Sequence, residues 1–135
     1  MYVKLMVIFM CSKSIKLLQE LKRISNWLDA YQIKNYTIRE DLSVDVDGMV
    51  DLQYKGIKEI PIQFGKIIGT FICSHNYITS TDGFPREVEQ DFYARYMIGI
   101  NQFRGGTGKS FTKDEILKVC KVRESYIFVN NYPYK

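Results

Sequence analysis

Histidine is nearly absent from this chain, because His75 is the only one in 135 residues. Its three cysteines, Cys11, Cys73 and Cys120, lie far apart and form no C-x-x-C pair. Zinc sites need clustered cysteine and histidine, and disulfide frameworks need an even set of cysteines, so the sequence argues against both. We therefore predict no metal site, and the cysteine usage favours a reducing compartment, the cytoplasm.

Recognisable catalytic groupings are missing as well. The sequence shows no Ser-His-Asp, Cys-His or paired-carboxylate arrangement that would support nucleophilic or acid-base chemistry. His75 stands beside a predicted bend, where we expect a turn residue rather than a general base. The sequence thus predicts no enzymatic activity, no catalytic residues and no cofactor.

Long hydrophobic runs are also scarce. The run Leu5–Met10 is far too short to span a bilayer, and no convincing cleavage site for a secretory signal follows it, so we expect a buried strand and no membrane partner. The net charge is +4, from 19 basic and 15 acidic residues that are well mixed. This mild excess gives nucleic-acid binding only slight support.

The chain does contain a repeat of about 21 residues between Val50 and Gly99, a spacing in the range of solenoid proteins. A strand at Phe71 and Cys73 would point both side chains to one side, while Asn76 would turn the chain and bond backbone groups in the bend. One copy cannot bury its apolar side alone, so the copies are expected to stack in parallel. Three sets of apolar residues occupy equivalent positions in successive repeats, and we call each set a column. The columns are Val50, Phe71 and Phe92; Leu52, Cys73 and Ala94; and Ile57 with Ile78. The middle copy reproduces the leucine-rich-repeat spacing at Ile68, Phe71, Cys73, Asn76 and Ile78.

The segment before the repeat predicts a helix and a hairpin. The apolar positions of the helix step by four and three residues, as expected for one buried stripe. Asp47-Gly48 stands between two alternating runs and predicts a hairpin turn, whose first strand would pair antiparallel along the edge of the repeat and cover it. The basic helix residues allow either a solvated face or a phosphate- or partner-binding face. The stripe is Leu17, Leu21, Ile24, Leu28 and Tyr31, and the basic residues are Lys13, Lys16, Lys22 and Arg23.

After the repeat comes Phe103–Ser110, which resembles the deviant phosphate-binding loop of partition-type ATPases. Phe103 stands where a full phosphate-binding loop needs glycine, and too few residues follow for the rest of such a fold. Two alternatives remain, a flexible glycine-rich connection and a candidate anion site at Arg104, Gly106 and Lys109. Thr112 and Glu115 then form a capping box. It starts a helix whose predicted apolar side is Ile116, Leu117, Val119 and Cys120, and Tyr126–Val129 follows as a final strand.

Together these features predict an α+β fold in one domain. It would be a short leucine-rich-repeat-like solenoid with about 2.5 repeats of about 21 residues. An N-terminal helix and hairpin (1–48) would cap the repeats (49–99), and a glycine-rich loop, helix and final strand (100–135) would close the other end.

Several runs of residues resemble a known family, the leucine-rich-repeat-like proteins of large tailed bacteriophages. These runs are Asp45–Gly48, Val50–Leu52, Ile57–Pro61, Phe64–Ile67 and Gly69–Ser80, and the resemblance covers about residues 33–98. It implies fold and origin and is nearly silent on activity. The expected function is a non-catalytic protein-binding module that binds or inhibits a host protein during host takeover, in the host cytoplasm. The alternative is a nucleic-acid- or nucleotide-binding factor that uses the basic helix and the loop around Lys109.

The repeat register also predicts where a partner would bind. Side chains alternate along a strand, so the neighbours of the inward columns point outward. Exposed aromatic and arginine groups dominate binding energy once desolvated, which favours the part around Tyr93 and Arg95. The alternative is that these side chains are solvated or covered by the chain's own terminal segments. The predicted partner-binding residues are Asp51, Gln53, Ile72, Ser74, Tyr93 and Arg95.

Overall fold

The structure, a computed structural model, describes residues 12–97 and 111–129. Within these ranges it contains two α-helices, one 3-10 turn and eight short strands, a mixed α+β architecture as predicted. The helical elements are α1 (Ser12–Ala30), α2 (Lys113–Val119) and η1 (Glu124–Tyr126). The strands are β1 (Tyr36–Ile38), β2 (Ser43–Val46), β3 (Val50–Asp51), β4 (Gln63–Ile67), β5 (Phe71–Ile72), β6 (Glu87–Val88), β7 (Phe92–Tyr93) and β8 (Ile127–Phe128).

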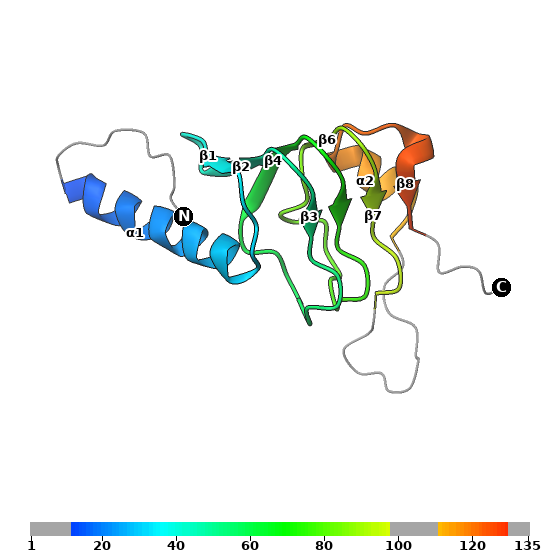
Figure 1. Cartoon of the computed structure of the whole chain (residues 1–135), viewed down its shortest axis with the longest axis horizontal. Coiled ribbons are helices and arrows are strands. Elements are labelled where there is room, and N and C mark those ends of the chain that lie inside the picture. Colours follow the sequence, from blue (N-terminus) through cyan, green and yellow to red (C-terminus); the bar gives the residue numbers. More distant parts are fainter. Residues whose placement is uncertain (1–11, 98–110, 130–135) are drawn as a thin grey trace.

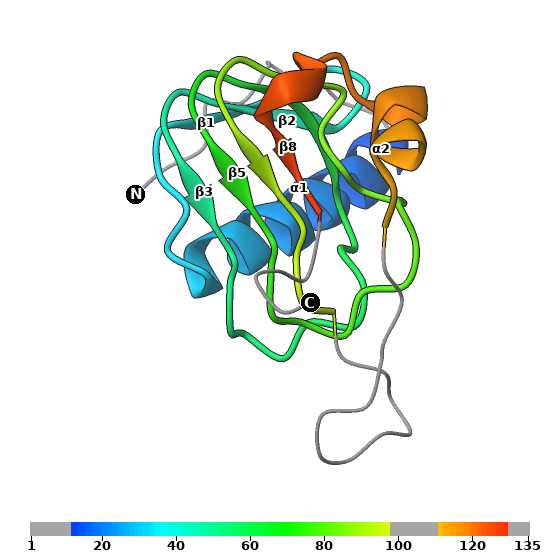
Figure 2. The same cartoon turned by 90° about the vertical axis from the view of Figure 1, so that its right-hand side faces the viewer.

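The strands belong to two sheets of four strands each. Sheet A has the order β1-β2-β4-β6, and sheet B has the order β3-β5-β7-β8. All pairs of strands within them are parallel except β1 with β2. Figure 1 shows α1 at one end of the molecule and α2 with β8 at the other, with the remaining strands between them. Viewed from that second end, β3, β5, β7 and β8 lie side by side in this order, and α1 crosses behind them (Figure 2).

The first predicted column is confirmed by the register of sheet B. Val50 pairs with Phe71 and Phe71 pairs with Phe92, each 21 residues further along the chain, and all three side chains are 0% exposed. The Phe71 ring lies 5.1 Å from that of Phe92 and 5.5 Å from that of Phe64, which comes from sheet A. The two sheets therefore share one core, and the phenylalanine rings fill it.

The Asn76 side chain links neighbouring turns of the chain through hydrogen bonds inside the bend. Its side chain is 0% exposed. Its Oδ1 accepts the backbone N–H groups of Lys55 at 3.1 Å and Ile57 at 2.9 Å. Its Nδ2 donates to the carbonyl oxygens of Leu52 at 2.8 Å and Cys73 at 2.9 Å. One buried amide thus satisfies backbone groups of two successive turns, as the sequence predicted for the bend.

The predicted hairpin at Asp47-Gly48 is wrong. The two strands that flank this turn, β2 and β3, belong to different sheets, so the turn is a corner between sheets A and B. Gly48 has a φ of 144°, and the Asp47 N–H donates to the Asn35 carbonyl at 3.0 Å. An Asp-Gly turn between alternating runs fits a corner as well as a hairpin. Here each flanking strand is buried against a parallel partner further along the chain, β4 for β2 and β5 for β3.

A hairpin does occur one step earlier in the chain. β1 pairs antiparallel with β2, with Thr37 opposite Asp45. Because β2 pairs in parallel with β4, the parallel stacking begins at Ser43, before the predicted boundary at residue 49. The first strand of the predicted hairpin is β2, and it does not cover the edge of the repeat at β3, because it lies inside sheet A between β1 and β4.

The helix predicted before the repeat is confirmed as α1. Leu21, Ile24 and Leu28 are buried, while Leu17 and Tyr31 are partly buried against the same core. The helix begins at Ser12. The predicted strand at Leu5–Met10 lies outside the described residues.

At the other end, the capping box of α2 is confirmed, because the Thr112 hydroxyl accepts the Glu115 N–H and the Glu115 carboxylate accepts the Thr112 N–H. The predicted apolar side is only half right: Ile116 and Cys120 are buried, whereas Leu117 is 37% and Val119 38% exposed. This helix is only seven residues long, and a single stripe of it contacts the core. The predicted final strand is confirmed as β8, which adds a further parallel row beside β7.

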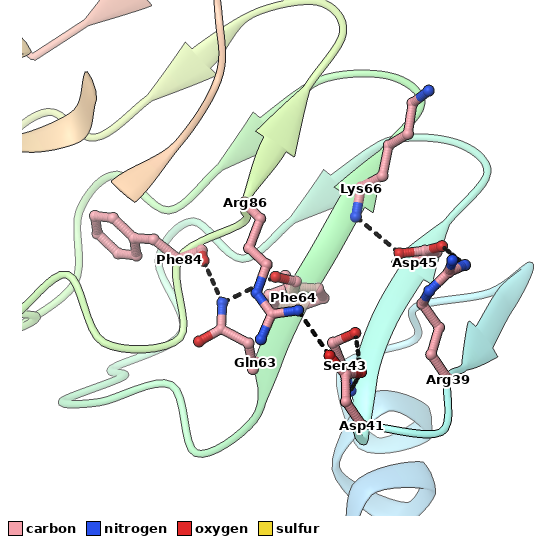
Figure 3. Close-up of polar contacts among 9 residues, drawn as sticks. All are labelled: Arg39, Asp41, Ser43, Asp45, Gln63, Phe64, Lys66, Phe84 and Arg86. Atoms are coloured by element: carbon pink, nitrogen blue, oxygen red, sulfur yellow. Dashed lines mark hydrogen bonds and ion pairs between the residues drawn. The ribbon is translucent and has the colours of Figure 1, made fainter. Parts of the chain in front are cut away.

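The outer side of sheet A is held by polar contacts between its strands (Figure 3). Asp45 of β2 accepts the Lys66 N–H of β4 at 2.8 Å, at a bulge in the register of the two strands. Arg86, next to β6, reaches across to Asp41 with an Nη1–Oδ2 distance of 2.9 Å. These contacts link positions 21 and 45 residues apart in the chain, so they fix the order of the stacked strands.

Candidate partner-binding surface

Sheet B brings the six predicted partner-binding residues to one face. Along each strand, the residues of the first two columns point into the core and are at most 1% exposed, so their neighbours point outward. The register stacks the outward residues in two ladders: Asp51, Ile72 and Tyr93; and Gln53, Ser74 and Arg95. We call these six residues the sheet-B face.

One member of this face is more buried than the sequence predicted. Ser74 is only 5% exposed, because its hydroxyl accepts the backbone N–H of Arg95 at 2.8 Å. The hydroxyl thus stabilises the stacking of two turns. Asp51 is exposed, and the other four residues are half-buried.

On the β7 side of the face, two stacked aromatic rings lie next to a guanidinium group. The rings of Tyr93 and Phe128 stack with their centroids 4.7 Å apart and their planes at 15°. The Arg95 guanidinium carbon lies 5.9 Å from the Tyr93 centroid and 5.3 Å from the Phe128 centroid, within the range of cation-π attraction. Sequence reasoning placed Phe128 in a final strand but missed its place on this face. Ile127 lies 35 positions after its partner Phe92, which breaks the 21-residue period that would have revealed it.

A second aromatic ladder borders the face and was also missed. Tyr54, His75 and Tyr96 stack in order, with centroids 4.2 Å and then 4.7 Å apart. All three have positive φ angles, of 58°, 60° and 56°, an uncommon conformation for residues other than glycine. Their 21-residue spacing was visible in the sequence and would have identified them. Partial burial in the stack lowers the pKa of His75 below its ordinary value.

Between the two aromatic groups lies a shallow, open hollow of about 230 Å³. Five of the six predicted residues line it, all except Asp51, together with His75 and Tyr96. Its walls combine ring surfaces with an amide, a hydroxyl and a guanidinium group. Such a mixture of apolar surface and hydrogen-bonding groups suits the side chains of a protein partner.

The basic residues of α1 present a less coherent surface. Arg23 donates to the Glu20 carboxylate and, at 3.2 Å, to the carbonyl of Pro61. It is therefore held in place by the protein itself, while Lys16 and Lys22 are exposed. The candidate anion-binding residues Arg104, Gly106 and Lys109 lie outside the described residues.

The thiols in the described part of the chain belong to the core. Burial raises the pKa of Cys73 well above its usual range, and it raises that of Cys120 to about 12. Neither forms the reactive thiolate at neutral pH. In residues 12–97 and 111–129, no group of three or more histidine, cysteine, aspartate or glutamate residues is placed to hold a metal ion. No helix in these ranges has the length and apolar character needed to cross a membrane.

Comparisons with protein-family models, curated proteins and solved structures find no match to this chain. Its function must therefore be argued from the residues of the sheet-B face and their geometry.

Proposed function

We propose that this protein is a non-catalytic protein-binding module that engages its partner through the sheet-B face. In this proposal the chain is a short leucine-rich-repeat-like solenoid of the kind found in large tailed bacteriophages, and the partner is a host protein that it binds or inhibits in the host cytoplasm. The observation that carries the proposal is the gathering of Ile72, Tyr93 and Arg95 around one open hollow. Aromatic and arginine side chains contribute most of the binding energy at protein interfaces.

Two features support the repeat assignment. Strands of sheet B recur every 21 residues in register from β3 to β7, which is the geometry of stacked repeats. Asn76 stands at the asparagine position of the repeat and bonds backbone groups of two turns. The resemblance to the phage proteins implies origin and fold.

The arrangement of Arg95 favours binding for a physical reason. Its guanidinium lies against two stacked rings, so much of its conformational entropy is already lost before a partner arrives. An ordered arginine beside tyrosine costs less to bring into an interface than a mobile one. The half-buried Ile72 in the next row supplies apolar surface for the same contact.

Affinity capture from host cells, followed by mass spectrometry, tests the proposal. One stoichiometric host protein should be recovered with the wild-type chain. The double variant Tyr93→Ala/Arg95→Ala should weaken its binding by at least about 2 kcal/mol, which is about 30-fold, while the chain stays folded.

The matched control is Arg123→Ala/Tyr126→Ala. These residues form another arginine-tyrosine pair, with the guanidinium 5.4 Å from the ring centroid, but they are not part of the sheet-B face. The control should bind the host protein as the wild type does. Full recovery by the folded Tyr93/Arg95 variant would move the binding surface elsewhere, and salt-sensitive recovery of nucleic acid alone would favour the alternative function.

A further inference from the structure

We infer that the outer edge of strand β3 is a further binding site, which adds a basic, extended segment of a partner protein to sheet B as an antiparallel strand. The site is centred on the backbone of Asp51. It differs in chemistry from the sheet-B face, because hydrogen bonds of the main chain provide the contact. The inference does not rest on the proposed function, and it follows from a comparison of the edges of the two sheets.

Both edges of sheet A are closed to a further strand. Tyr36 and Ile38 of β1 alternate with residues that bond to β2, so their backbone groups point outward. These two residues are only 6% and 2% exposed. On β6, Val88 is 3% exposed, and its outward N–H donates to the Lys121 carbonyl. Each edge is therefore buried or bonded within the protein.

The β8 edge of sheet B is buried as well. The Phe128 carbonyl accepts the Ala94 N–H from β7, so the backbone groups of Ile127 and Val129 point outward. These two residues are 2% and 6% exposed. The Ile127 N–H also donates to the Glu124 carbonyl, which removes one donor from this edge.

The β3 edge differs from these three. Val50 and Leu52 donate their N–H groups to carbonyls of β5 and its extension, so the N–H and C=O of Asp51 between them point to the outer edge. Asp51 is exposed, and Met49 is 59% exposed. In the described part of the chain no strand lies on this side of β3. Asp51 thus offers a backbone donor and a backbone acceptor to a partner.

The open stretch is short and favours one direction of pairing. It begins after the corner at which the Asp47 N–H donates to the Asn35 carbonyl. It ends at Gln53, whose N–H is accepted by the Asp51 carboxylate at 3.1 Å. In an antiparallel neighbour, the residue opposite Asp51 exchanges both backbone hydrogen bonds with it, so one outward residue is used in full.

Charge beside this edge selects a basic partner. Asp47 and Asp51 are exposed, and neither forms an ion pair with a described residue. Opposed residues of paired strands point to the same face, so a lysine or arginine opposite Asp51 would lie beside its carboxylate. Its two neighbours would point to the other face, next to the buried Val50 and Leu52, and should be apolar. The expected segment is therefore a basic residue between two apolar ones.

A second copy of this chain is a poorer partner for the edge. A β3–β3 pair centred on Asp51 would place this carboxylate opposite its counterpart, and like charges directly opposite each other are destabilising. Charged side chains on an edge strand commonly prevent such self-pairing. The same charge attracts a strand of opposite charge.

An NMR titration of the full chain with a synthetic peptide tests the inference. The probe is acetyl-Thr-Val-Lys-Val-Thr-amide. It should cause saturable shifts of the Met49, Asp51 and Gln53 backbone amides, with a Kd of about 1 mM. A peptide with glutamate in place of lysine should bind about fivefold more weakly. A peptide methylated at the backbone nitrogen of its lysine lacks the N–H that Asp51 accepts, so it should not bind.

A charge reversal in the protein tests the selection of a basic segment. Asp51→Lys should bind the lysine peptide about fivefold more weakly and the glutamate peptide about fivefold more tightly than the wild type does. Because Asp51 is exposed, this variant is expected to fold. The matched control, Asp82→Lys, reverses an exposed charge outside β3 and should bind both peptides as the wild type does.

Several outcomes would overturn the inference. These are no saturable shift at about 10 mM peptide, equal binding of the methylated peptide, or equal affinity of Asp51→Lys for both charged peptides. An Asp51 amide protected from exchange without peptide would show that the chain itself occupies the edge. Shifts that depend on protein concentration alone would show self-pairing, and either result contradicts a separate partner. The titration uses no host protein, so its outcome and that of the capture experiment are independent.

Discussion

The carboxylate of Asp45 occupies the space beside Gly65 in which any larger residue would place its Cβ atom. The two residues lie on neighbouring strands, β2 and β4, at the bulge where their register shifts. Asp45 Oδ1 accepts the Lys66 N–H at 2.8 Å, and its Oδ2 accepts Arg39 Nη1 at 2.7 Å (Figure 3). Glycine at position 65 therefore lets a side chain replace a backbone partner in the ladder.

The variant Gly65→Ala should lose about 1–3 kcal/mol of stability in urea unfolding, because its methyl group displaces that carboxylate. The cost should be smaller when Gly65→Ala is made in an Asp45→Ala background, where the space is empty. Additive costs in this double-mutant cycle would show that the two side chains do not compete for one space.

Asn76→Ala should cost about 2–4 kcal/mol, because it leaves buried backbone groups of Leu52 and Ile57 without their partner. Asn26→Ala, an exposed asparagine on α1, is the matched control and should change stability by less than about 0.5 kcal/mol. Chemical denaturation measures both. An Asn76→Ala variant as stable as the control would mean that water replaces the lost bonds.

Phe71→Ala should destabilise the protein by about 3–5 kcal/mol, since its ring contacts those of Phe64, Phe84 and Phe92 in the shared core. Tyr54→Ala removes an aromatic ring of similar size that is 69% exposed, and it should cost much less. Thermal melting of both variants checks this difference. Equal melting temperatures would contradict the central place of Phe71 in the core.

Stability should fall in acid partly through Asp41. Hydrogen bonds from Arg86 and then from Ser43 hold the pKa of its carboxyl below the ordinary value. A group whose pKa is lower in the folded state stabilises the fold above its unfolded pKa, about 3.9, and loses that contribution as the pH falls through the lowered value.

The Asp41→Asn variant should therefore show a smaller drop in melting temperature between about pH 6 and about pH 2 than the wild type does. The pair is exposed, so added salt should weaken the difference. Parallel melting curves for wild type and variant across this range would show that Asp41 carries none of the acid sensitivity.

The sequence predicted the parts of the fold that follow from period and polarity. The columns through Phe71, the stripe through Ile24 and the cap at Thr112 all follow from local spacing, and all are confirmed. The strands of sheet A were harder to predict. Apolar and polar residues do not alternate regularly along Gln63–Ile67, so this segment resembles the irregular connection between two repeats. The strand Ser43–Val46 pairs in parallel with Gln63–Ile67, about 20 positions further along the chain, and not with the nearby Val50–Leu52. Local sequence patterns do not encode such a distant pairing.

The candidate site was predicted in outline, because alternation along a strand fixes which side chains share a face. Alternation gave no warning that the Ser74 hydroxyl bonds Arg95 and is buried. Alternation also did not predict that Phe128 lies beside Tyr93, because β8 pairs with β7 although it comes 35 positions later in the chain. The Tyr54–His75–Tyr96 ladder was accessible to sequence reasoning, but only to a search for polar and aromatic residues at the same period.

The parallel stacking of sheet B also predicts which of its hydrogen bonds are lost when its last strand unfolds locally. In sheet B the amide of Cys73 donates to Tyr93, one row on, while the amide of Ala94 donates to Phe128 in the terminal row. Detaching that last row exposes Ala94 and leaves the bonds of Cys73 intact. Amide hydrogens should therefore exchange with deuterium faster at Ala94 than at Cys73, whose bond joins the two inner strands β5 and β7.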